Sequence, residues 1–471
     1  MANEIVFKLF KTYAHPYLYD RHTNSLIRIT EDEFNELTAV QKDELECTES
    51  HVVKKYQAQG VLTPNVVETI EHPASMILEQ YMDTRMKQLT LQVTQQCNLR
   101  CEYCVYSGTY THNRTHANKR MSFEIAKKAI EFFLERSWAR SDVTIGFYGG
   151  EPLLEFELIK QCVEYTKAQV EGKHIKFNMT TNGTLLRDEV VDFLVEHDFM
   201  LGISLDGAKD EHDASRKFSN GEGSFETIIR NIERIKQRYP AYDAKISILT
   251  TINPHMDLGC VMEYFNTSDI MNDRLIMFNM MNTDGLEQEV VYEDKFHLIR
   301  NFEYIKAMLA MAGKLDRKYV SNLAIMSVSS LIKLRNGLRK RNELGSVAHH
   351  GGPCMPGPHR LFVRVDGSLF PCERVNESLD YYKLGNLDDG IDVDKARKIL
   401  NVGQITDSEC KKCWMLNNCS ICIGQATFET EPTRHDKMRV CEIQAGNVAT
   451  DLYEIAILGE FGFDGEGWGV S

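Results

Sequence analysis

Three closely spaced cysteines are the residues of this sequence best suited to chemistry. Cys97, Cys101 and Cys104 lie in the stretch VTQQCNLRCEYCVY, with three and then two residues between them. Three thiolates on one short loop can hold three irons of a [4Fe–4S] cluster, which usually has four cysteine ligands. The fourth iron would then be open to a small molecule. Zinc or three unrelated thiols are the alternatives, although zinc normally takes four ligands, often in paired C-x2-4-C units.

A second group of cysteines occupies the last quarter of the chain. It comprises Cys354, Cys372, Cys410, Cys413, Cys419, Cys422 and Cys441. Cysteines grouped in this way in a cytosolic protein are more often metal ligands than disulfides. The C-x2-C spacing within the group also fits zinc, so a pair of zinc knuckles is the alternative to iron. Cys162 and Cys260 stand alone in apolar helical patterns, and we expect both in the core.

The first cysteine group lies in a segment that alternates strands and helices six times. We predict strands at 88–94, 143–148, 175–181, 201–205, 245–251 and 275–280, and helices such as 123–136 and 225–238. Buried, β-branched strands that alternate with helices indicate a parallel sheet. Chemistry in such folds lies at the carboxyl ends of the strands, so the residues that follow each strand are candidates for the functional site.

Polar and glycine-rich motifs follow three of these strands. They are Gly149-Gly150-Glu151-Pro152, Thr181-Asn182-Gly183, and Ser204-Leu205-Asp206-Gly207 with Arg216 shortly after. Paired glycines allow close backbone approach, and Arg offers a bidentate fork to a carboxylate. Together with the first cysteine loop, these motifs resemble the radical S-adenosylmethionine (radical SAM) family.

The resemblance implies a core at residues 87–285 with the partial (β/α)6 TIM barrel of that family. SAM would bind the open iron, and one electron would split it into methionine and a 5′-deoxyadenosyl radical. The implied SAM-binding residues are Tyr103 near the adenine, Gly149, Gly150 and Glu151 near the amino group, Asn182, and Ser204 and Arg216 near the carboxylate. We expect Asp206 to hold the turn, and Arg216 has the alternative of a surface charge.

The N-terminal residues 1–86 read as a small α+β domain. Strands are predicted at 6–10, 16–20 and 25–29, with a polar turn at Arg21–Asn24. A capping box at 30–33 opens a helix through Leu37, and a second helix at 52–62 stops at Gly60. This pattern resembles the winged-helix-like RiPP recognition element, which binds the leader of a precursor peptide (RiPPs are ribosomally made, later modified peptides). Strand addition would bind the leader, and a stabilising cap is the alternative.

The C-terminal cysteines resemble those of the SPASM domain, which carries two auxiliary [4Fe–4S] clusters, here at residues 346–450. Carried over by position, the outer cluster would take Cys410, Cys413, Cys419 and Cys441, and the inner one Cys354, Cys372 and Cys422. The chain has two residues between Cys419 and Cys422 where the family has three. Seven thiolates cannot fill eight positions, so a substrate thiolate, a water or a distant residue would complete the inner cluster.

Three smaller predictions concern the rest of the C-terminal half. Glu373 stands where related sulfatase maturases have a catalytic aspartate, and it is either a base or a polar neighbour. His349 and His350 are expected as solvated loop residues. Residues 286–345, with LIKLRNGLRKRNEL as the clearest helix, read as a helical bridge, and 451–471 as a tail to which we assign no role.

Bulk properties limit the remaining possibilities. The chain has 471 residues, enough for two to four domains, and a formal charge of −14, which argues against nucleic acid as a partner. It has no run of 18 apolar residues and no secretory signal pattern, so we expect no membrane partner and a cytoplasmic location.

The fold class expected is therefore α/β: a partial (β/α)6 TIM barrel with an N-terminal winged-helix-like domain and a C-terminal iron–sulfur SPASM domain. The resemblance implies a RiPP maturase of the sactipeptide or ranthipeptide type, which forms thioethers between a cysteine sulfur and a carbon of the precursor peptide. It would use three [4Fe–4S] clusters, SAM and an external one-electron donor such as flavodoxin or ferredoxin. Another peptide crosslink, formylglycine formation as in anaerobic sulfatase maturation, and a zinc-stabilised peptide-binding scaffold remain the alternatives.

Overall fold

Six parallel strands form the part of the main sheet that the sequence predicts. In this computed structural model they are β5 (Gln88–Thr94), β6 (Asp142–Gly149), β7 (His174–Thr181), β8 (Met200–Ser204), β9 (Ser247–Ile252) and β10 (Ile276–Met280). Each pairs in parallel with the next along the chain. The parallel sheet is thus confirmed. The structure describes residues 4–111, 113–170, 172–271, 274–283, 285–286, 289–338, 343–425, 431–463 and 468.

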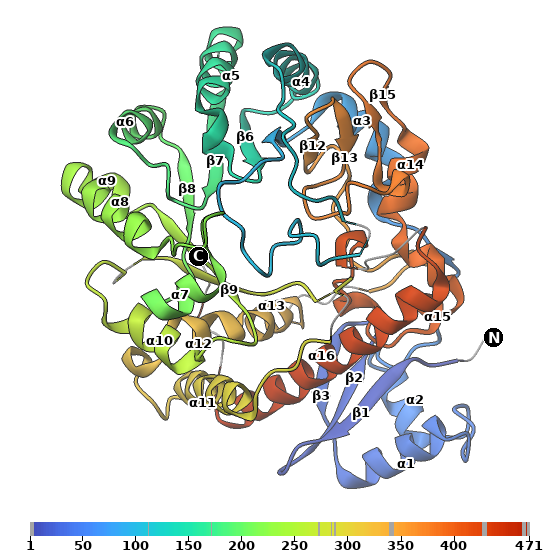
Figure 1. Cartoon of the computed structure of the whole chain (residues 1–471). Coiled ribbons are helices and arrows are strands. Elements are labelled where there is room, and N and C mark those ends of the chain that lie inside the picture. The colour runs from blue at the N-terminus through green and yellow to red at the C-terminus, as the bar shows by residue number, and fades with distance from the viewer. Residues whose placement is uncertain are drawn as a thin grey trace.

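Helices connect these strands and cover the outer side of the sheet (Figure 1). They are α4 (Phe123–Glu135), α5 (Phe156–Gln169), α6 (Asp188–Glu196), α7 (Lys209–Ser215), α8 (Phe225–Arg238), α9 (Pro240–Asp243) and α10 (Leu258–Thr267). A short 3-10 helix, η2 (Pro152–Glu155), follows β6. Cys162 of α5 is buried as predicted, but Cys260 is exposed. The Cys260 prediction is wrong because the buried stripe of α10 runs through Leu258, Val261 and Phe265, and Cys260 lies off that face.

The C-terminal region extends the same sheet, which the sequence did not predict. β12 (Leu361–Val363) pairs in parallel with β5. β13 (Ser368–Phe370), β14 (Gly385–Asn386) and β15 (Gly390–Ile391) then add in antiparallel order. Strands of two or three residues carry too little periodicity to be recognised in sequence. The helices that follow are η4 (Asp380–Tyr382), α14 (Val393–Leu400), η5 (Val402–Thr406), α15 (Asp407–Lys412), η6 (Leu416–Asn418) and η7 (Ile423–Gln425).

The N-terminal segment forms its own three-stranded antiparallel sheet and apolar core. Its elements are β1 (Phe7–Lys11), β2 (Pro16–Asp20), β3 (Ser25–Arg28), α1 (Glu31–Gln41) and α2 (His51–Gln57). The capping box at Thr30 and Glu33 is confirmed, and α1 continues four residues beyond the predicted end at Leu37. Leu18, Leu37 and Val53 belong to the core beneath the sheet.

The turn between β2 and β3 consists of polar residues, as predicted, and is largely buried. The Arg21 guanidinium is 2% exposed and donates to the Lys411 carbonyl at 2.7 Å. Asn417 donates to the Arg21 carbonyl at 2.6 Å. The turn therefore docks the N-terminal sheet against the segment that carries the C-terminal cysteines. In Figure 1 this sheet lies beside the helix α16 (Arg434–Glu460).

Two predicted boundaries do not coincide with the ends of packed elements. β4 (Thr69–Ile70) pairs with β11 (Val347–Ala348) and is followed by η1 (Pro73–Ile77) and α3 (Leu78–Thr84). Leu78 and Met82 of α3 lie in the main core, so residues preceding the boundary at 86 pack with the barrel. The helix α16 (Arg434–Glu460) continues through residue 450. The other proposed boundaries stay predictions.

Helices fill the segment between the barrel and the second cysteine group, as the sequence indicates. They are α11 (Asp294–Met311), η3 (Arg317–Tyr319), α12 (Asn322–Ser327) and α13 (Ser329–Leu338). Residues 339–342 of the predicted helix lie outside the described residues. Leu331 of α13 and Leu452 of α16 share a second core with Tyr19 of β2. In the part of the chain that is described, no helix is both long and apolar enough to span a membrane.

Candidate functional site

A cavity of about 350 Å³ lies at the carboxyl ends of the parallel strands. All candidate residues of the first cysteine loop and of the strand-end motifs line it: Cys97, Cys101, Tyr103, Cys104, Gly149, Gly150, Glu151, Asn182, Ser204 and Arg216. Segments more than a hundred residues apart in sequence therefore meet at one place. Glu373 and the C-terminal cysteines are not among the residues that line this cavity.

The two glycines after β6 allow the strand to lie directly against the segment that leads into the cysteine loop. A Cβ atom at Gly149 would come closer than 3.0 Å to the Thr94 carbonyl oxygen, and one at Gly150 closer than 3.0 Å to that of Gln96. Two hydrogen bonds hold this approach, from Gly150 N to Thr94 O at 3.2 Å and from Glu151 N to Gln96 O at 2.9 Å. The glycines are thus required for packing against the protein's own backbone, and they set the position of Cys97.

Glu151 is a buried carboxylate that holds the next motif. It accepts hydrogen bonds from Thr181 Oγ1 and Asn182 N, both at 2.7 Å, and from Leu153 N at 3.0 Å. Burial raises the pKa of Glu151 to about 7, against the opposing effect of these hydrogen bonds. Asn182 in turn donates to Asn98 of the cysteine loop at 2.8 Å. In this structure Glu151 therefore orders the turn after β7, and Asn182 links that turn to the cysteines.

Asp206, which the sequence analysis assigned only to a turn, bonds three residues that line the cavity on its other side, Tyr103, Arg216 and Thr251. Its carboxylate is fully buried and accepts hydrogen bonds from Arg216 Nε at 2.7 Å, from Thr251 N at 2.9 Å and from the Tyr103 hydroxyl. Arg216 is buried, so it is not a surface charge. Burial raises the pKa of Cys101 to about 11, and the neighbouring Arg216 guanidinium acts in the opposite direction.

His212 binds the backbone of Asp206 and the side chain of Ser224. Its Nδ1 accepts the Asp206 backbone N–H at 3.2 Å, and its Nε2 lies 2.9 Å from Ser224 Oγ. Burial lowers the pKa of His212 to about 4, so the ring is neutral at neutral pH.

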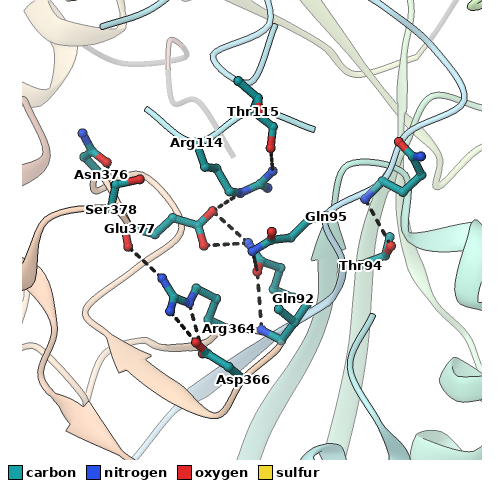
Figure 2. A network of polar contacts seen from close by, with 12 residues as sticks. Gln92, Thr94, Gln95, Arg114, Thr115, Arg364, Asp366, Asn376, Glu377 and Ser378 are labelled. Atoms are coloured by element: carbon teal, nitrogen blue, oxygen red, sulfur yellow. Dashed lines mark hydrogen bonds and ion pairs between the residues drawn. The ribbon is translucent and has the colours of Figure 1, made fainter. Parts of the chain in front are cut away.

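A second buried network joins the barrel to the C-terminal region (Figure 2). Glu377 accepts two hydrogen bonds of 2.9 Å from Gln92 of β5 and forms an ion pair with Arg114. The Arg114 guanidinium lies 3.5 Å from the ring centre of Tyr106, which lines the cavity beside Cys104. Sequence reasoning missed this network because 263 positions separate Arg114 from Glu377 and no motif marks either residue.

The C-terminal cysteines fall into two sets by the groups that act on them. Cys410, Cys413, Cys419 and Cys441 influence one another electrostatically, whereas Cys372 is influenced by Cys422. Gly352, just before Cys354, lies against the backbone of Ser420 and Ile421, where a Cβ atom would clash. Ser420 and Ile421 lie between Cys419 and Cys422, so this approach brings the segment of Cys354 close to both. The set of four and the pair of Cys372 and Cys422 agree with the outer and inner groups of the sequence analysis, whereas the place of Cys354 and both cluster assignments stay predictions.

Glu373 forms an ion pair with Arg360 at 2.6 Å, so its carboxylate has a partner in this structure. Its role as a base stays a prediction.

The prediction for the two loop histidines is wrong. His350 is 1% exposed, and both of its ring nitrogens lack hydrogen-bond partners among the described residues. His349 accepts the Gly403 N–H at 2.9 Å. The glycine and proline that follow indicate a loop, but they do not reveal that the loop is covered by α16 and η5.

The donor set at the cavity fits an iron–sulfur cluster. Three thiols line one cavity beside a buried guanidinium, whose positive charge suits an anionic group. The glycines at the end of β6 fix the position of the loop that carries these thiols. In the described ranges, no three His, Cys, Asp or Glu side chains converge closely enough for a single metal ion.

Comparison with known proteins identifies the barrel. Residues 91–264 match the family model of the radical SAM superfamily. The cysteine-type anaerobic sulfatase-maturating enzyme of Clostridium perfringens is 26% identical over 334 residues, which are 69% of this chain and 84% of that protein. The radical SAM cyclopropyl synthase TigE of Paramaledivibacter caminithermalis is 21% identical over 421 residues, 84% of this chain and 80% of that protein.

Solved structures show the same fold. "Native anSMEcpe with bound AdoMet" superimposes with a TM-score of 0.56 at 22% identity, over 79% of this chain and 99% of that one. Another structure of that protein, with AdoMet and the Kp18Cys peptide, has a TM-score of 0.55. The chain therefore contains a radical SAM domain with a mixed α/β fold and a large, mainly parallel sheet.

The first prediction concerns the contact of Gly150. Gly150→Ala should displace the segment before Cys97, destabilise the protein by about 1–3 kcal/mol and weaken SAM binding. Gly446→Ala is the matched control, because Gly446 lies in α16 with no atom near its would-be Cβ; it should raise stability by up to about 1 kcal/mol. Urea unfolding and SAM binding to the iron-loaded protein measure both effects. Equal behaviour of the two variants would show that the close approach does not matter.

The second prediction concerns the neutral ring of His212. Its pKa falls from the ordinary 6.5 to about 4 on folding, so below pH 6.5 the unfolded chain binds a proton that the folded one does not. This group should therefore cost about 2 kcal/mol of stability between pH 7.5 and pH 5. His212→Gln keeps a donor and an acceptor but does not titrate, so its loss of stability over the same range should be smaller by that amount. Denaturant unfolding at both pH values measures it, and identical losses would contradict the assignment.

Proposed function

We propose that this radical SAM enzyme is a peptide maturase that joins a cysteine sulfur to a carbon of another residue in a ribosomally made precursor peptide. The observation that supports the proposal is that Cys410, Cys413, Cys419 and Cys441 act on one another, whereas Cys372 is acted on by Cys422. Cys354 would be the third cysteine of the second set. A four-cysteine set completes a [4Fe–4S] cluster. A three-cysteine set leaves one ligand position, which a thiolate of the peptide can fill.

The cavity would serve SAM and the first cluster. Cys97, Cys101 and Cys104 would hold a cluster, which supplies the electron that cleaves SAM. Arg216, fixed by Asp206, would bind the SAM carboxylate together with Ser204, and Tyr103 would lie against the adenine. The AdoMet in the structure of similar fold supports this assignment.

Glu151, Gly149, Gly150 and Asn182 would act by ordering the cavity. Their contacts bind the turn after β7 and the end of β6 to the cysteine loop. These residues would keep the loop in place while SAM enters, which is the kind of preorganisation that positions a reacting group.

The C-terminal region would be a SPASM domain with two auxiliary clusters. Cys410, Cys413, Cys419 and Cys441 would hold the outer cluster, and Cys354, Cys372 and Cys422 the inner one. Glu373 follows Cys372 and would either assist proton removal or fix the local chain through Arg360. The network of Glu377 and Arg114 would keep this region in register with the cavity, since it joins β5 to the segment after Cys372.

The N-terminal sheet would be a winged-helix-like RiPP recognition element that binds the leader of the precursor. Ile29 N donates to Pro16 O at 3.0 Å, and hydrogen-bonded pairs alternate along antiparallel strands. The backbone groups of Leu26 and Arg28 therefore face away from β2. Within the described residues no strand pairs with this edge of β3, so an extended leader can add there.

Formylglycine formation is the second candidate, because the sulfatase-maturating relative matches over 84% of its own length. The two reactions differ in their products. A thioether keeps the cysteine sulfur in the peptide, whereas formylglycine formation from cysteine removes it. The precursor in a RiPP pathway would also need a leader site, which the N-terminal sheet offers.

The third prediction tests the proposed reaction. The anaerobically reconstituted chain should contain about twelve irons, four for each cluster. With SAM, a reductant and the cysteine-containing peptide encoded beside its gene, it should yield a product that lacks two hydrogens per crosslink, keeps its sulfur and no longer reacts with thiol reagents. Cys101→Ala is the control and should form no 5′-deoxyadenosine. Loss of sulfur from the peptide would favour formylglycine instead, and zinc without sulfide would exclude both enzymes.

The fourth prediction tests the leader site. Arg28→Pro removes a backbone N–H that faces away from β2, and proline is tolerated on a strand edge. Leader binding should weaken about three- to tenfold, which corresponds to one net hydrogen bond. Arg28→Ala keeps the N–H and should bind the leader normally, as measured by anisotropy of a labelled leader. If both variants bind alike, the leader does not pair with β3.

A further inference from the structure

Lys437 of α16 is a buried cation in a place where a cation is unfavourable. Its side chain is 1% exposed, and lysines are almost never fully buried unless they are paired. It is the fourth residue of the helix, close to the N-terminal end, where the helix dipole disfavours positive charge. Burial and the helix dipole therefore both disfavour the charged ammonium of Lys437 at this position.

No carboxylate in the described part of the chain pairs with Lys437. Its Nζ donates to Thr406 Oγ1 at 2.5 Å and lies 3.5 Å from Cys410 Sγ. The neighbouring rings of His349 and His350 supply no anion, because a histidine ring is either neutral or positively charged. The negative charge that matches Lys437 must therefore come from the side of Cys410.

The four-cysteine set lies on that side. Lys437 and Cys441 are four residues apart on α16 and so share one face of the helix. The ammonium thus lies 3.5 Å from Cys410 Sγ and on the face of α16 that carries Cys441.

A second buried cation approaches the same set from the N-terminal sheet. Arg21 bonds the Lys411 carbonyl and Asn65 Oδ1 at 2.7 and 2.5 Å, and its Nε has no partner among the described residues. Lys411 lies between Cys410 and Cys413 in the sequence, so Arg21 is held beside the loop that joins these two cysteines. Two buried cations from distant segments therefore flank one group of four thiols.

We propose that Lys437 is the counter-cation of the outer iron–sulfur cluster and that its ammonium raises the reduction potential of that cluster. The inference rests on the proposed function, because it assumes a cluster at Cys410, Cys413, Cys419 and Cys441. Reduction adds a negative charge to a group that its thiolates already make anionic. A fixed positive charge nearby, in a site with little water, stabilises the reduced form more than the oxidised one.

The fifth prediction concerns this potential. The full chain, reconstituted without oxygen, is titrated with reductant while electron paramagnetic resonance follows the outer cluster, whose signal is the one that Cys413→Ala removes. At the midpoint potential of the wild type, the outer cluster of Lys437→Met should be about ten times less abundant in its reduced form than in its oxidised form. This ratio corresponds to a midpoint potential that is lower by about 59 mV for one electron. Lys437→Arg keeps the charge and should stay near the wild type.

Lys412→Met is the matched control, because Lys412 is also next to the cysteine set but is half exposed and pairs with Glu4. Solvent screens that charge, so the ratio should not change. An unchanged ratio in Lys437→Met, or the same shift in the Lys412 control, would overturn the proposal. If Lys437→Met binds four fewer irons than the wild type, Lys437→Arg should still bind the full number. Loss of four irons in both variants would also overturn the proposal. If Cys413→Ala removes neither iron nor signal, the proposed outer cluster itself is absent.

Discussion

Charge that is buried away from water has to be matched inside the protein, and this constraint organises the region around the cavity. Asp206 is matched by Arg216 and the Tyr103 hydroxyl, and Glu377 by Arg114 and Gln92. In each case the partners come from different loops. The hydrogen bonds and ion pairs that match each buried charge therefore also fix the loops relative to one another. They give the cysteine loop a defined position. Under our proposal the same constraint applies to Lys437, whose partner would be the cluster held by the outer cysteines.

The C-terminal region belongs to the same sheet as the barrel rather than standing beside it. β12 continues the parallel order next to β5, and the side chain of Gln92 on β5 meets Glu377 from the segment after Cys372 (Figure 2). One strand thus contacts both cysteine-bearing parts of the chain. A peptide held between them would face two sites whose separation the sheet determines, which suits a reaction that joins two positions of one substrate.

The regular elements and the members of the cavity follow from local patterns. Alternating strands and helices predict the six parallel strands, and the motifs after β6, β7 and β8 predict which residues meet at their carboxyl ends. The predictions that failed concern exposure. Cys260 lies off the buried face of α10 and is exposed, whereas His350 is buried. Burial of a loop depends on what packs over it, and the partner segments here are tens to hundreds of residues away.

The sequence by itself determined the spacing of the cysteines, the order of the strands and the types of side chain at the strand ends, because these depend on neighbours along the chain. Only the tertiary structure decided that Asp206 holds Arg216 and Tyr103, that the glycines of the β6 motif pack against residues 94 and 96, and that Lys437 is buried beside Cys410. These features arise where distant segments exclude water together. A buried charge acquires its partner only when the whole chain has folded around it.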